Sequence, residues 1–306
     1  MNMAPMVPVH VAICACTMDR PAGLAELLTG LAELRFQKVT RAPRLTLVIA
    51  DNSQTGSARA QIGAARPRLP FPVIYAHEPE RGYANARNAL LDATPGDADW
   101  FAFIDDDERP SPLWLDSLLA TAEATGAPLI AGPVHPDFQE TPPGWAERGG
   151  FFELGPFGEG EPAPYVSTNN ALVRKSVIDR YGWRFDPAFN RHGGEDEHFF
   201  RRAMDAGLRA VTSADAIVSE TIPPERVTAA WLFRRHRRMG RTIARIDRKN
   251  GRIASRAIKA AGWMVFGAAN GATGIAGPSV RSMRGLCHLA WSAGSLEELL
   301  FGNDEA

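Results

Sequence analysis

Apolar and polar positions alternate in blocks over the first 133 residues. Short apolar runs rich in β-branched and aromatic side chains predict strands at 9–14, 45–50, 71–76, 100–104 and 128–133. Between them, apolar residues at helical spacing predict helices at 23–34, 83–93 and 112–124. Because the strand runs are continuously apolar, helices are expected on both faces of the sheet. The pattern predicts an α/β fold with a mostly parallel central sheet.

Polar clusters follow three of these predicted strands. They are TMDRP at 17–21, DNSQ at 51–54 and DDDE at 105–108. In open parallel sheets, ligands bind beyond the carboxyl ends of the strands. The three clusters therefore predict a binding site at one edge of the sheet.

Asp105, Asp106 and Asp107 follow an apolar strand directly, and this row needs a positive partner because like charges repel one another. A hard divalent cation, Mg²⁺ or Mn²⁺, takes oxygen ligands and often shares them with substrate phosphates. On an extended segment, Asp105 and Asp107 would point the same way, toward a common ligand. Helix capping is an alternative, but it accounts for one acid rather than three.

A second acidic group lies in RHGGEDEHFFRRAMDAGL, residues 191–208. Gly193 and Gly194 permit a tight turn, and a helix is expected to begin at Glu195 and Asp196. The helix dipole keeps carboxylates in a first turn ionised, and such an anion can accept a proton from a hydroxyl group. Ordinary helix N-terminal electrostatics is the alternative, and the residues alone leave it open.

The second half of the chain has a different composition. Residues 134–164 are rich in Pro, Gly and aromatic side chains without a clear period, which is typical of a long functional excursion. From Arg234 to Lys259 there are eleven Lys or Arg residues and one acid, although the whole chain has a net charge of −1. This asymmetry predicts an anionic partner for the basic stretch. Nucleic acid is disfavoured because base-stacking aromatic residues are sparse there.

Residues 260–280 carry no charge over a length that could span a membrane. Most of them are small or weakly polar, so a surface-lying or re-entrant element on anionic lipid is expected instead. The alternative is a C-terminal helical subdomain packed on the core. The three cysteines form no disulfide framework, and the N-terminus lacks a signal-peptide pattern. Both features predict a cytoplasmic protein.

Six segments, taken together and in order, make the chain resemble the inverting family-2 glycosyltransferases of the GT-A (Rossmann-like) fold. The segments are ICACTMDRP, VIADNSQ, ERGYANARNALL, FIDDDERPSPLWL, STNNALVRKSVI and FDPAFNRHGGEDEHFFRRAMDAGLRA. They cover roughly residues 8–240. The stretch ETIPPERVTAAWLFRRHRRMG looks like the subset that acts in bacterial exopolysaccharide assembly, such as succinoglycan-type glucosyltransferases.

The resemblance implies a role for each matching position. Asp196 would be the base that deprotonates the acceptor hydroxyl, with Glu195 beside it. Asp107 would hold Mn²⁺ or Mg²⁺ bridging the diphosphate, and Asp105 would approach the ribose and the metal. The other implied contacts to the nucleotide sugar come from Asp19, Arg20, Asp51, Arg81, Arg87, Asn88, Asp106, Asn169 and Asn170, with Arg235 and Arg238 as a clamp for the leaving diphosphate.

The sequence departs from the family pattern in three places. Where many relatives carry a metal-binding histidine, this chain has VSE ending in Glu220, which would ligate the metal or contact the acceptor. Met18 and Asp19 replace Tyr and Asn in the first loop, which changes the contacts to the base. The Q-x-x-R-W pattern of processive synthases is absent, so transfer of a single sugar is expected.

The resemblance also implies a domain organisation and partners. Residues 1–225 would form the glycosyltransferase domain, with a nucleotide-binding half at 8–133 and an acceptor-side half at 134–225. Residues 226–306 would form a basic helical region that meets an anionic membrane surface through 234–280. The expected donor is a nucleotide sugar, with UDP favoured, and the acceptor is lipid-linked or a polysaccharide. The expected location is peripheral, at the inner face of the plasma membrane.

Two other functions fit the residues less well. A nucleotidyltransferase would need a lysine in a glycine-rich loop after the first strand, and CTMDRPAG contains no lysine. A non-catalytic sugar-nucleotide or membrane-binding relative would have lost its base, whereas GGED is intact. The sequence therefore favours the glycosyltransferase.

Overall fold

The computed structural model describes residues 8–271 and 277–302, which divide into two compact units. The first contains the chain up to His135 together with Leu154–Glu220, and the second contains Pro136–Glu153 together with the chain from Thr221 on. The backbone passes between the units three times: within β7 (Val134–Phe138), between Glu153 and Leu154, and within β10 (Val218–Ile222).

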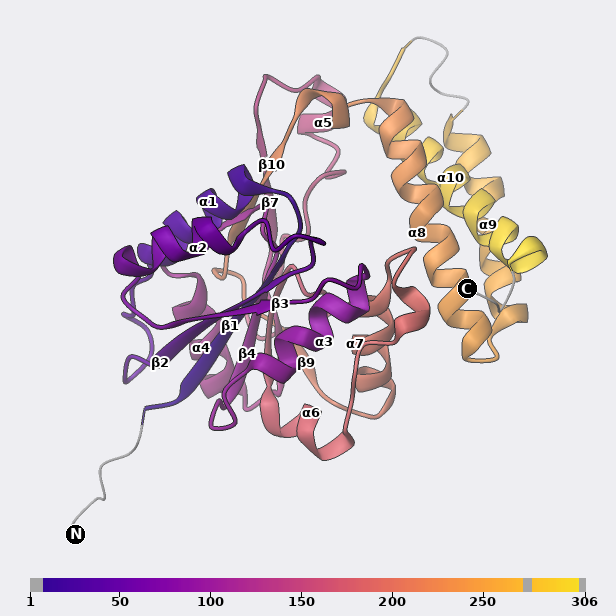
Figure 1. Cartoon of the computed structure of the whole chain (residues 1–306). Helices are drawn as coiled ribbons and strands as arrows, with labels where there is room; N and C mark the ends of the chain where they lie inside the picture. Colours follow the sequence, from indigo (N-terminus) through magenta and orange to yellow (C-terminus); the bar gives the residue numbers. More distant parts are fainter. Residues whose placement is uncertain (1–7, 272–276, 303–306) are drawn as a thin grey trace. The chain divides into compact units, whose positions relative to one another are not determined.

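A seven-stranded sheet in the order β3-β2-β1-β4-β8-β6-β9 forms the centre of the first unit (Figure 1). Its strands are β1 (His10–Thr17), β2 (Arg44–Asp51), β3 (Val73–His77), β4 (Trp100–Ile104), β6 (Leu129–Ala131), β8 (Asn170–Arg174) and β9 (Ala210–Thr212). All neighbours pair in parallel except β8, which lies antiparallel between β4 and β6. The expectation of a mostly parallel sheet is confirmed, and β8 is the exception to it.

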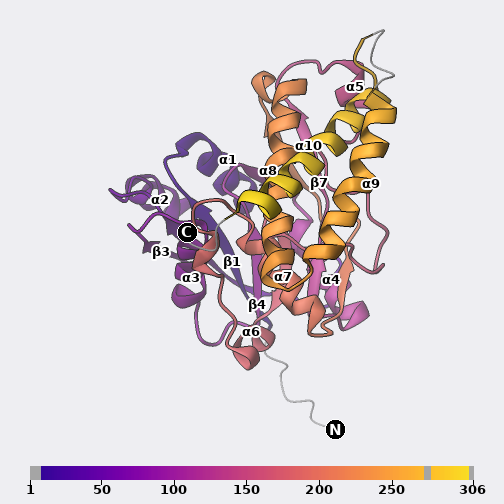
Figure 2. The ribbon, with the colours of Figure 1, turned by 90° about the vertical axis from the view of Figure 1, so that its right-hand side faces the viewer.

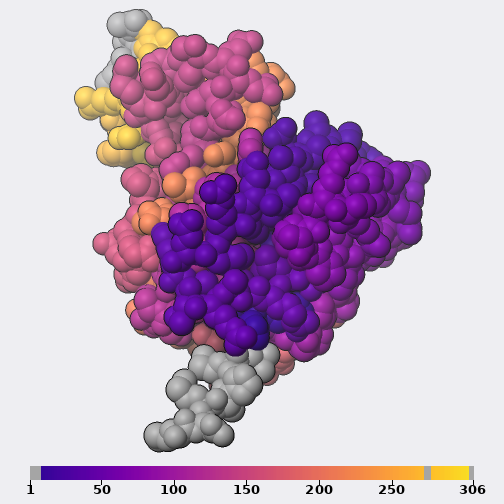
Figure 3. All heavy atoms as spheres, turned by 90° about the vertical axis from the view of Figure 1, so that its left-hand side faces the viewer, coloured from indigo at the N-terminus to yellow at the C-terminus, as the bar shows by residue number. Residues whose placement is uncertain are grey.

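Helices cover both faces of this sheet, as predicted. The helices are α1 (Pro21–Ala32), α2 (Arg59–Ala65), α3 (Tyr83–Ala93), α4 (Trp114–Thr125), α6 (Lys175–Tyr181) and α7 (Glu195–Asp205). Successive strand residues enter different cores: Ile13 packs with α1, α2 and α4, while Cys14 packs with α3, α6 and α7. This alternation explains the continuously apolar strands. In the space-filling view the segment from β1 to α3, indigo to violet, forms one continuous surface (Figure 3).

The carboxyl ends of β1, β2 and β4 meet at one edge of the sheet. Thr17 and Asp51 are paired at the ends of β1 and β2, and β4 runs parallel to β1 on its other side. The clusters that follow these strands therefore emerge at the same edge. A short strand beyond them, β5 (Glu108–Pro110), pairs antiparallel with β10 and sets Glu220 opposite Glu108.

Residues 134–164 contain regular structure that their composition did not predict. They include β7 and a short helix, α5 (Gly144–Glu147), and Val134 and Leu154 form an antiparallel bridge. Residues 136–153 of this excursion belong to the second unit. The excursion thus contributes to both units.

Three long helices dominate the second unit: α8 (Ala229–Lys249), α9 (Ile253–Gly271) and α10 (Val280–Phe301) (Figure 2). A small apolar core that includes Phe152, Leu232 and Met283 holds the unit together. Residues 260–271 of the predicted uncharged segment belong to α9, and residues 272–276 lie outside the described part of the chain. None of the helices among residues 8–271 and 277–302 is long and apolar enough to cross a membrane.

Several arginines of the basic stretch pair with acids of α10 within this unit. Arg237 of α8 binds Glu297 of α10 through two hydrogen bonds of 2.9 and 2.7 Å. Arg245 and Arg248 both contact Glu298, whose side chain is completely buried. The expectation that the whole stretch meets an external anion is therefore wrong for these arginines, because α10 supplies partners that lie 60 positions further along the chain for Arg237 and 53 for Arg245.

Candidate functional site

Arg87 of α3 links three distant segments at the sheet edge. Its side chain is 11% exposed, and its guanidinium pairs with Glu195 at the start of α7 and with Asp105 after β4 at 3.6 Å. Its Nε donates to Thr168 Oγ1 at 2.9 Å. Burial alone lowers the pKa of Arg87, but Glu195 and Asp105 offset this and raise it above its ordinary value. The arginine is a permanent cation that holds two carboxylates in place.

The first turn of α7 carries Glu195 and Asp196 in different environments. The helix begins after Gly193 and Gly194, which have φ angles of 73° and 94° that favour glycine. Glu195 is buried, and burial raises its pKa although Arg87 opposes the shift. Asp196 is partly exposed, and its Oδ2 accepts a hydrogen bond from Ser167 Oγ at 2.8 Å. Asp196 is thus the more accessible carboxylate of the two.

The aspartate row forms a turn and not the extended segment that the sequence predicted. Glu108 N donates to Asp105 O at 3.3 Å, which closes a turn through Asp106 and Asp107. As a result, Asp105 and Asp107 have different partners: Asp105 faces Arg87, while Asp107 accepts a 2.8 Å bond from Arg20 Nη1. The expectation of an extended segment is therefore wrong, and a common ligand for Asp105 and Asp107 stays a prediction.

Negative charge at this turn exceeds what the two arginines neutralise. Desolvation raises the pKa of Asp105 to about 7, even though 41% of its side chain is accessible. The positive charge of Arg87 lowers this pKa, whereas the negative charges of Asp107 and Asp106 raise it. Burial and the neighbouring Asp105 also raise the pKa of Glu108, and Glu220 lies close enough to contribute. Asp106 Oδ2 is buried and has no hydrogen-bond partner.

This donor set fits a hard divalent cation chemically, because carboxylate oxygens are the ligands such ions take and excess negative charge attracts them. Among residues 8–271 and 277–302, however, no group of three or more His, Cys, Asp or Glu side chains is arranged to hold a metal ion. Arg20 pairs with both Asp106 and Asp107 instead. The predicted ligands Asp105, Asp107 and Glu220 stay a prediction.

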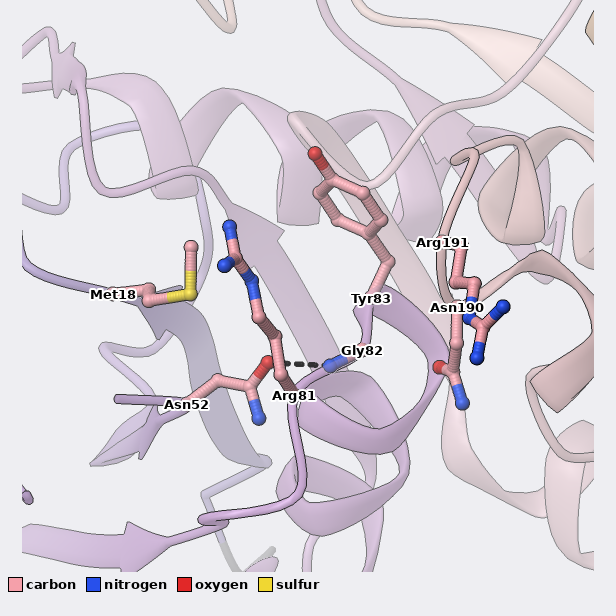
Figure 4. Close-up of a pocket in the computed structure, with 7 residues that line it drawn as sticks. All are labelled: Met18, Asn52, Arg81, Gly82, Tyr83, Asn190 and Arg191. Atoms are coloured by element: carbon pink, nitrogen blue, oxygen red, sulfur yellow. Dashed lines mark hydrogen bonds between the residues drawn. The ribbon is translucent and has the colours of Figure 1, made fainter. Parts of the chain in front are cut away.

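A cavity of about 400 Å³ opens at the same edge of the sheet. Figure 4 shows its lining residues, which are Met18, Asn52, Arg81, Gly82, Tyr83, Asn190 and Arg191. The Arg81 side chain extends between Met18 and Tyr83 (Figure 4). No ion pair or hydrogen bond engages its exposed guanidinium within the described residues. A thioether, an aromatic ring and an unpaired guanidinium are groups that can enclose a planar, anionic ligand.

The cavity and the carboxylates share the same two segments. Tyr83 and Arg87 are one helical turn apart on α3, so they lie on the same side of that helix. Asn190 contacts α3 through its side chain, accepting from Asn85 N at 3.1 Å and donating to Asn85 Oδ1 at 2.9 Å. Residues 83–87 and 190–196 therefore run side by side. A ligand seated in the cavity would have its next groups near Arg87, Glu195 and Asp196.

Gly82 makes the approach of these two segments possible. A Cβ at this position would lie 2.3 Å from Asn190 Cγ, which is closer than real contacts allow. We expect Gly82→Ala to destabilise the fold by about 1–3 kcal/mol, because Asn190 is fixed by Asn85 and cannot yield freely. Urea unfolding measures this loss.

Gly63→Ala is the matched control for this prediction. Gly63 lies on exposed α2, where a Cβ meets nothing within 4 Å, so alanine should be neutral or slightly stabilising. Equal midpoints for Gly82→Ala and the unmodified protein would contradict the close-approach argument.

Three predicted contact residues are turned inward. Asp51 is fully buried, and its carboxylate accepts from Ser53 N, Ala58 N and Tyr75 OH at 2.8–3.0 Å. Asn88 exchanges two hydrogen bonds with the backbone of Phe185. Asn170 is 1% exposed and binds Trp114 Nε1 and two backbone carbonyls. These hydrogen bonds hold the three side chains against the protein, and their predicted contacts with the nucleotide sugar stay a prediction.

Other predicted residues remain available at the surface of the first unit. Asp19 is exposed and has a φ angle of 55°, the left-handed region that non-glycine residues adopt rarely. Such strain clusters at functional sites. Asn169 is partly exposed and has no hydrogen bond within the described residues.

Arg235 and Arg238 belong to α8 in the second unit. Arg235 lies over the Trp231 ring at 5.2 Å. The predicted contact of both arginines with the diphosphate stays a prediction.

Sequence reasoning missed the residues that organise the site. Ser167 and Thr168 lie in STNNALVRKSVI, where the family resemblance pointed to Asn169 and Asn170 alone. Tyr83 at helical spacing from Arg87 was a usable signal, since positions four apart share a helix face. Asn52, whose side chain binds Glu78 O, Glu80 O and Gly82 N, had no signal of its own, because its partners are defined only by the fold.

Two family models match the chain. The model for glycosyl transferase family 2 matches residues 12–182, and the model for glycosyl transferase family group 2 matches residues 100–299. A curated relative, the succinoglycan biosynthesis protein ExoM of Rhizobium meliloti strain 1021, is 38% identical over 242 residues, which are 79% of this chain and 76% of that protein.

Solved structures share the fold at low sequence identity. The mannosyltransferase PcManGT from Pyrobaculum calidifontis, in complex with GDP-Man and Mn²⁺, has a TM-score of 0.61 at 17% identity and covers 98% of this chain and 89% of its own. Residues 1–349 of Staphylococcus aureus TarS, in complex with UDP-GlcNAc, have a TM-score of 0.54 at 15% identity, with coverage of 94% and 91%.

Proposed function

This chain belongs to glycosyl transferase family 2, and we propose that it transfers a single sugar from a nucleotide-sugar donor to a lipid-linked or polysaccharide acceptor, with inversion at the anomeric carbon. The observation that carries the proposal is the placement of Asp196, held by Ser167, beside the Arg87–Glu195–Asp105 cluster and close to the cavity. The identity to a succinoglycan biosynthesis protein supports a role in exopolysaccharide synthesis.

The donor nucleotide would occupy the cavity between Met18, Arg81 and Tyr83. Among the described residues, no hydrogen bond or ion pair engages the Arg81 guanidinium, so it can pair with phosphate at little cost. Asp19 and Arg20 border the same edge and would contact the nucleotide as well. We favour a UDP-sugar as the donor. One structural relative was solved with UDP-GlcNAc, and another was solved with GDP-Man.

Transfer would proceed in one step at Asp196. As the acceptor oxygen attacks the anomeric carbon, Asp196 takes its proton, and the bond from that carbon to the diphosphate oxygen breaks on the opposite face. A single displacement inverts the configuration. The departing diphosphate gains charge that Arg87 and Arg81 can stabilise. Glu195 pairs with Arg87 through Oε1, while its Oε2 is buried without a hydrogen-bond partner among the described residues, and we assign Glu195 the positioning of that arginine rather than proton transfer.

Asp107 and Asp105, with Glu220 as a candidate third ligand, would hold Mn²⁺ or Mg²⁺. When bound, the cation would neutralise charge on the diphosphate. In this structure Arg20 pairs with Asp107. For Asp107 to hold a cation, Arg20 would have to leave this carboxylate, and it would then be available to pair with a phosphate of the donor.

A thermal-shift experiment tests donor and metal together. UDP-glucose, UDP-GlcNAc and GDP-mannose are each added with Mn²⁺, Mg²⁺ or EDTA. At about 100 times Kd, a ligand that binds only the native state adds about 2.7 kcal/mol of stability, so we expect Tm to rise by several degrees with one nucleotide class and a metal. Asp107→Asn should lose the metal-dependent part of the rise.

Asp215→Asn serves as the control, because Asp215 is an exposed carboxylate paired only with Lys38. It should respond like the unmodified protein. A rise in Tm that persists in EDTA would contradict the metal assignment. The function would be contradicted if no donor transferred radiolabelled sugar to membrane or polysaccharide fractions.

The domain organisation and location follow as proposals. Residues 1–225 would form the catalytic domain, including 8–133 for the nucleotide and 134–225 for the acceptor, and 226–306 would form the membrane-facing region. An acceptor carried on lipid requires the enzyme to work at a membrane surface. We therefore place it at the cytoplasmic face of the plasma membrane, as a peripheral protein.

A further inference from the structure

Helix α9 leaves most of its surface uncovered. Only Arg256, Ala260 and Gly267 are buried among its residues 253–271. Gly267 packs against α10, where an added Cβ would lie 3.0 Å from Gly285 O. The buried strip of α9 is therefore narrow, and the rest of the helix surface faces away from the core of the second unit.

The uncovered side chains are large and apolar. Ile258 and Val265 are 74% and 73% exposed, and Phe266 is 52% exposed. Trp263 and Met264 are also exposed, and Trp263 stacks on His288 with ring centroids 4.5 Å apart. Ile258 and Val265 are seven residues apart and share one side of α9, with Phe266 next to them, whereas Trp263 and Met264 lie nearer the buried seam. We call Ile258, Val265 and Phe266 the α9 face. Apolar side chains exposed together on one side of a helix mark an interaction site, whereas single exposed apolar residues need no explanation.

The charges around the α9 face have one sign. No Asp or Glu occurs between Asp247 and Glu297, and this stretch contains seven Lys or Arg residues. Arg256 is neutralised by Asp247 at 2.6 Å, but Lys259 lies next to Ile258, and Arg281 and Arg284 are exposed on α10. A second copy of this chain would bring like charges together, so the surroundings favour an anionic partner.

The composition distinguishes a helix that lies on a bilayer from one that crosses it. Nineteen residues would suffice in length, but α9 contains many Ala and Gly residues, and no helix among the described residues is apolar enough to span. An apolar face with aromatic side chains and flanking cations is typical of a helix lying in the headgroup region of anionic lipid.

We propose that the α9 face is the membrane-docking surface of this protein. Ile258, Val265 and Phe266 insert into the acyl boundary of an anionic bilayer, while Lys259 and the arginines of α10 contact lipid phosphates. The inference rests on the proposed membrane location of the enzyme and identifies the surface that makes the contact.

Vesicle flotation of the full chain tests the proposal. We expect binding to phosphatidylcholine–phosphatidylglycerol vesicles, weaker binding at high salt, and little binding to phosphatidylcholine alone. The double substitution Ile258→Glu with Val265→Glu should lower the partition coefficient at least about tenfold, because both apolar groups leave the bilayer. Both positions are highly exposed, so the fold should be kept, and circular dichroism verifies this.

Ala60→Glu with Ala64→Glu on exposed α2 adds the same charge elsewhere and should bind vesicles like the unmodified protein. Equal loss in both double variants would overturn the proposal, since it would show a general charge effect. So would equal binding to neutral and anionic vesicles, or no binding to either.

Light scattering without lipid provides a further check. A dimer that disappears in the Ile258→Glu, Val265→Glu variant would show that a second copy covers the α9 face, which also overturns the proposal. Donor-induced thermal shifts are measured in parallel without lipid. If these persist while vesicle binding fails, the docking surface is wrong and the proposed transfer stands.

Discussion

Asp196→Asn is expected to lower kcat for sugar transfer by about 10²–10⁴-fold, the usual contribution of a general base. The substitution removes the proton acceptor but keeps a side chain of the same shape next to Ser167 and the Glu197 N–H. Donor binding and thermal stability should therefore change little. Steady-state kinetics with the preferred donor, together with donor-induced thermal shifts, separate the two effects.

Asp179→Asn is a suitable control for this variant. Asp179 is an exposed carboxylate on α6 that pairs with Lys175 at 2.6 Å. Exposed pairs of this kind contribute about 0–1 kcal/mol, so its kcat should match that of the unmodified protein. If Asp196→Asn retained full kcat, the base would have to be another group, and Asp196 would only be a helix-terminal charge.

The second large effect is expected at Arg87. Arg87→Met should reduce the free energy of unfolding at pH 8 by about 3–5 kcal/mol, because it leaves the buried carboxylate of Glu195 without its counter-ion. Arg87→Lys should be more stable than Arg87→Met but less stable than the unmodified protein. An ammonium lacks the planar set of donors with which arginine contacts Glu195, Asp105 and Thr168 at once. Urea unfolding measures the loss.

The loss at Arg87 should depend on pH in a defined direction. Without the arginine, the pKa of Glu195, already raised by burial, rises further above its unfolded value. A carboxyl whose pKa is higher in the native state than in the unfolded state binds more protons in the native state. The free energy of unfolding therefore falls as pH rises from the unfolded pKa to the native pKa. Arg87→Met should therefore be less destabilising at pH 5 than at pH 8.

Two controls make the Arg87 prediction specific. Arg184→Met breaks an exposed pair with Asp92 and should cost no more than about 1 kcal/mol. Adding Glu195→Gln to Arg87→Met should recover part of the loss, because no buried charge remains at that position. A loss that is the same at both pH values, with no recovery in the double variant, would contradict the buried-charge explanation.

Several features of the fold follow from local sequence. The predicted helix at 83–93 and the predicted strand at 100–104 coincide with α3 and β4, because their apolar periodicity is a property of neighbouring residues alone. The start of α7 was also predictable, since Gly193 and Gly194 take the left-handed conformations that end a turn. Polar clusters directly after apolar strands were enough to locate the site at the carboxyl edge of the sheet.

Tertiary contacts decided which polar side chains are buried. Asp51 ends β2 and Asn170 begins β8, but their partners, Tyr75 and Trp114, come from neighbouring elements and hold them inside the protein. Glu195 and Asp196 are adjacent in sequence and acquire different environments because Arg87, 108 positions away from Glu195, reaches only one of them.

The sequence by itself determined the family, the parallel strands and the set of carboxylates and arginines available for chemistry. The tertiary structure alone decided the antiparallel insertion of β8, the pairing of Arg237 and Arg245 with α10, and the role of Ser167 beside Asp196. The physical reason is the distance along the chain over which each interaction acts. Periodicity and turn preferences act between near neighbours, whereas burial and charge compensation depend on groups that folding brings together from distant parts of the chain.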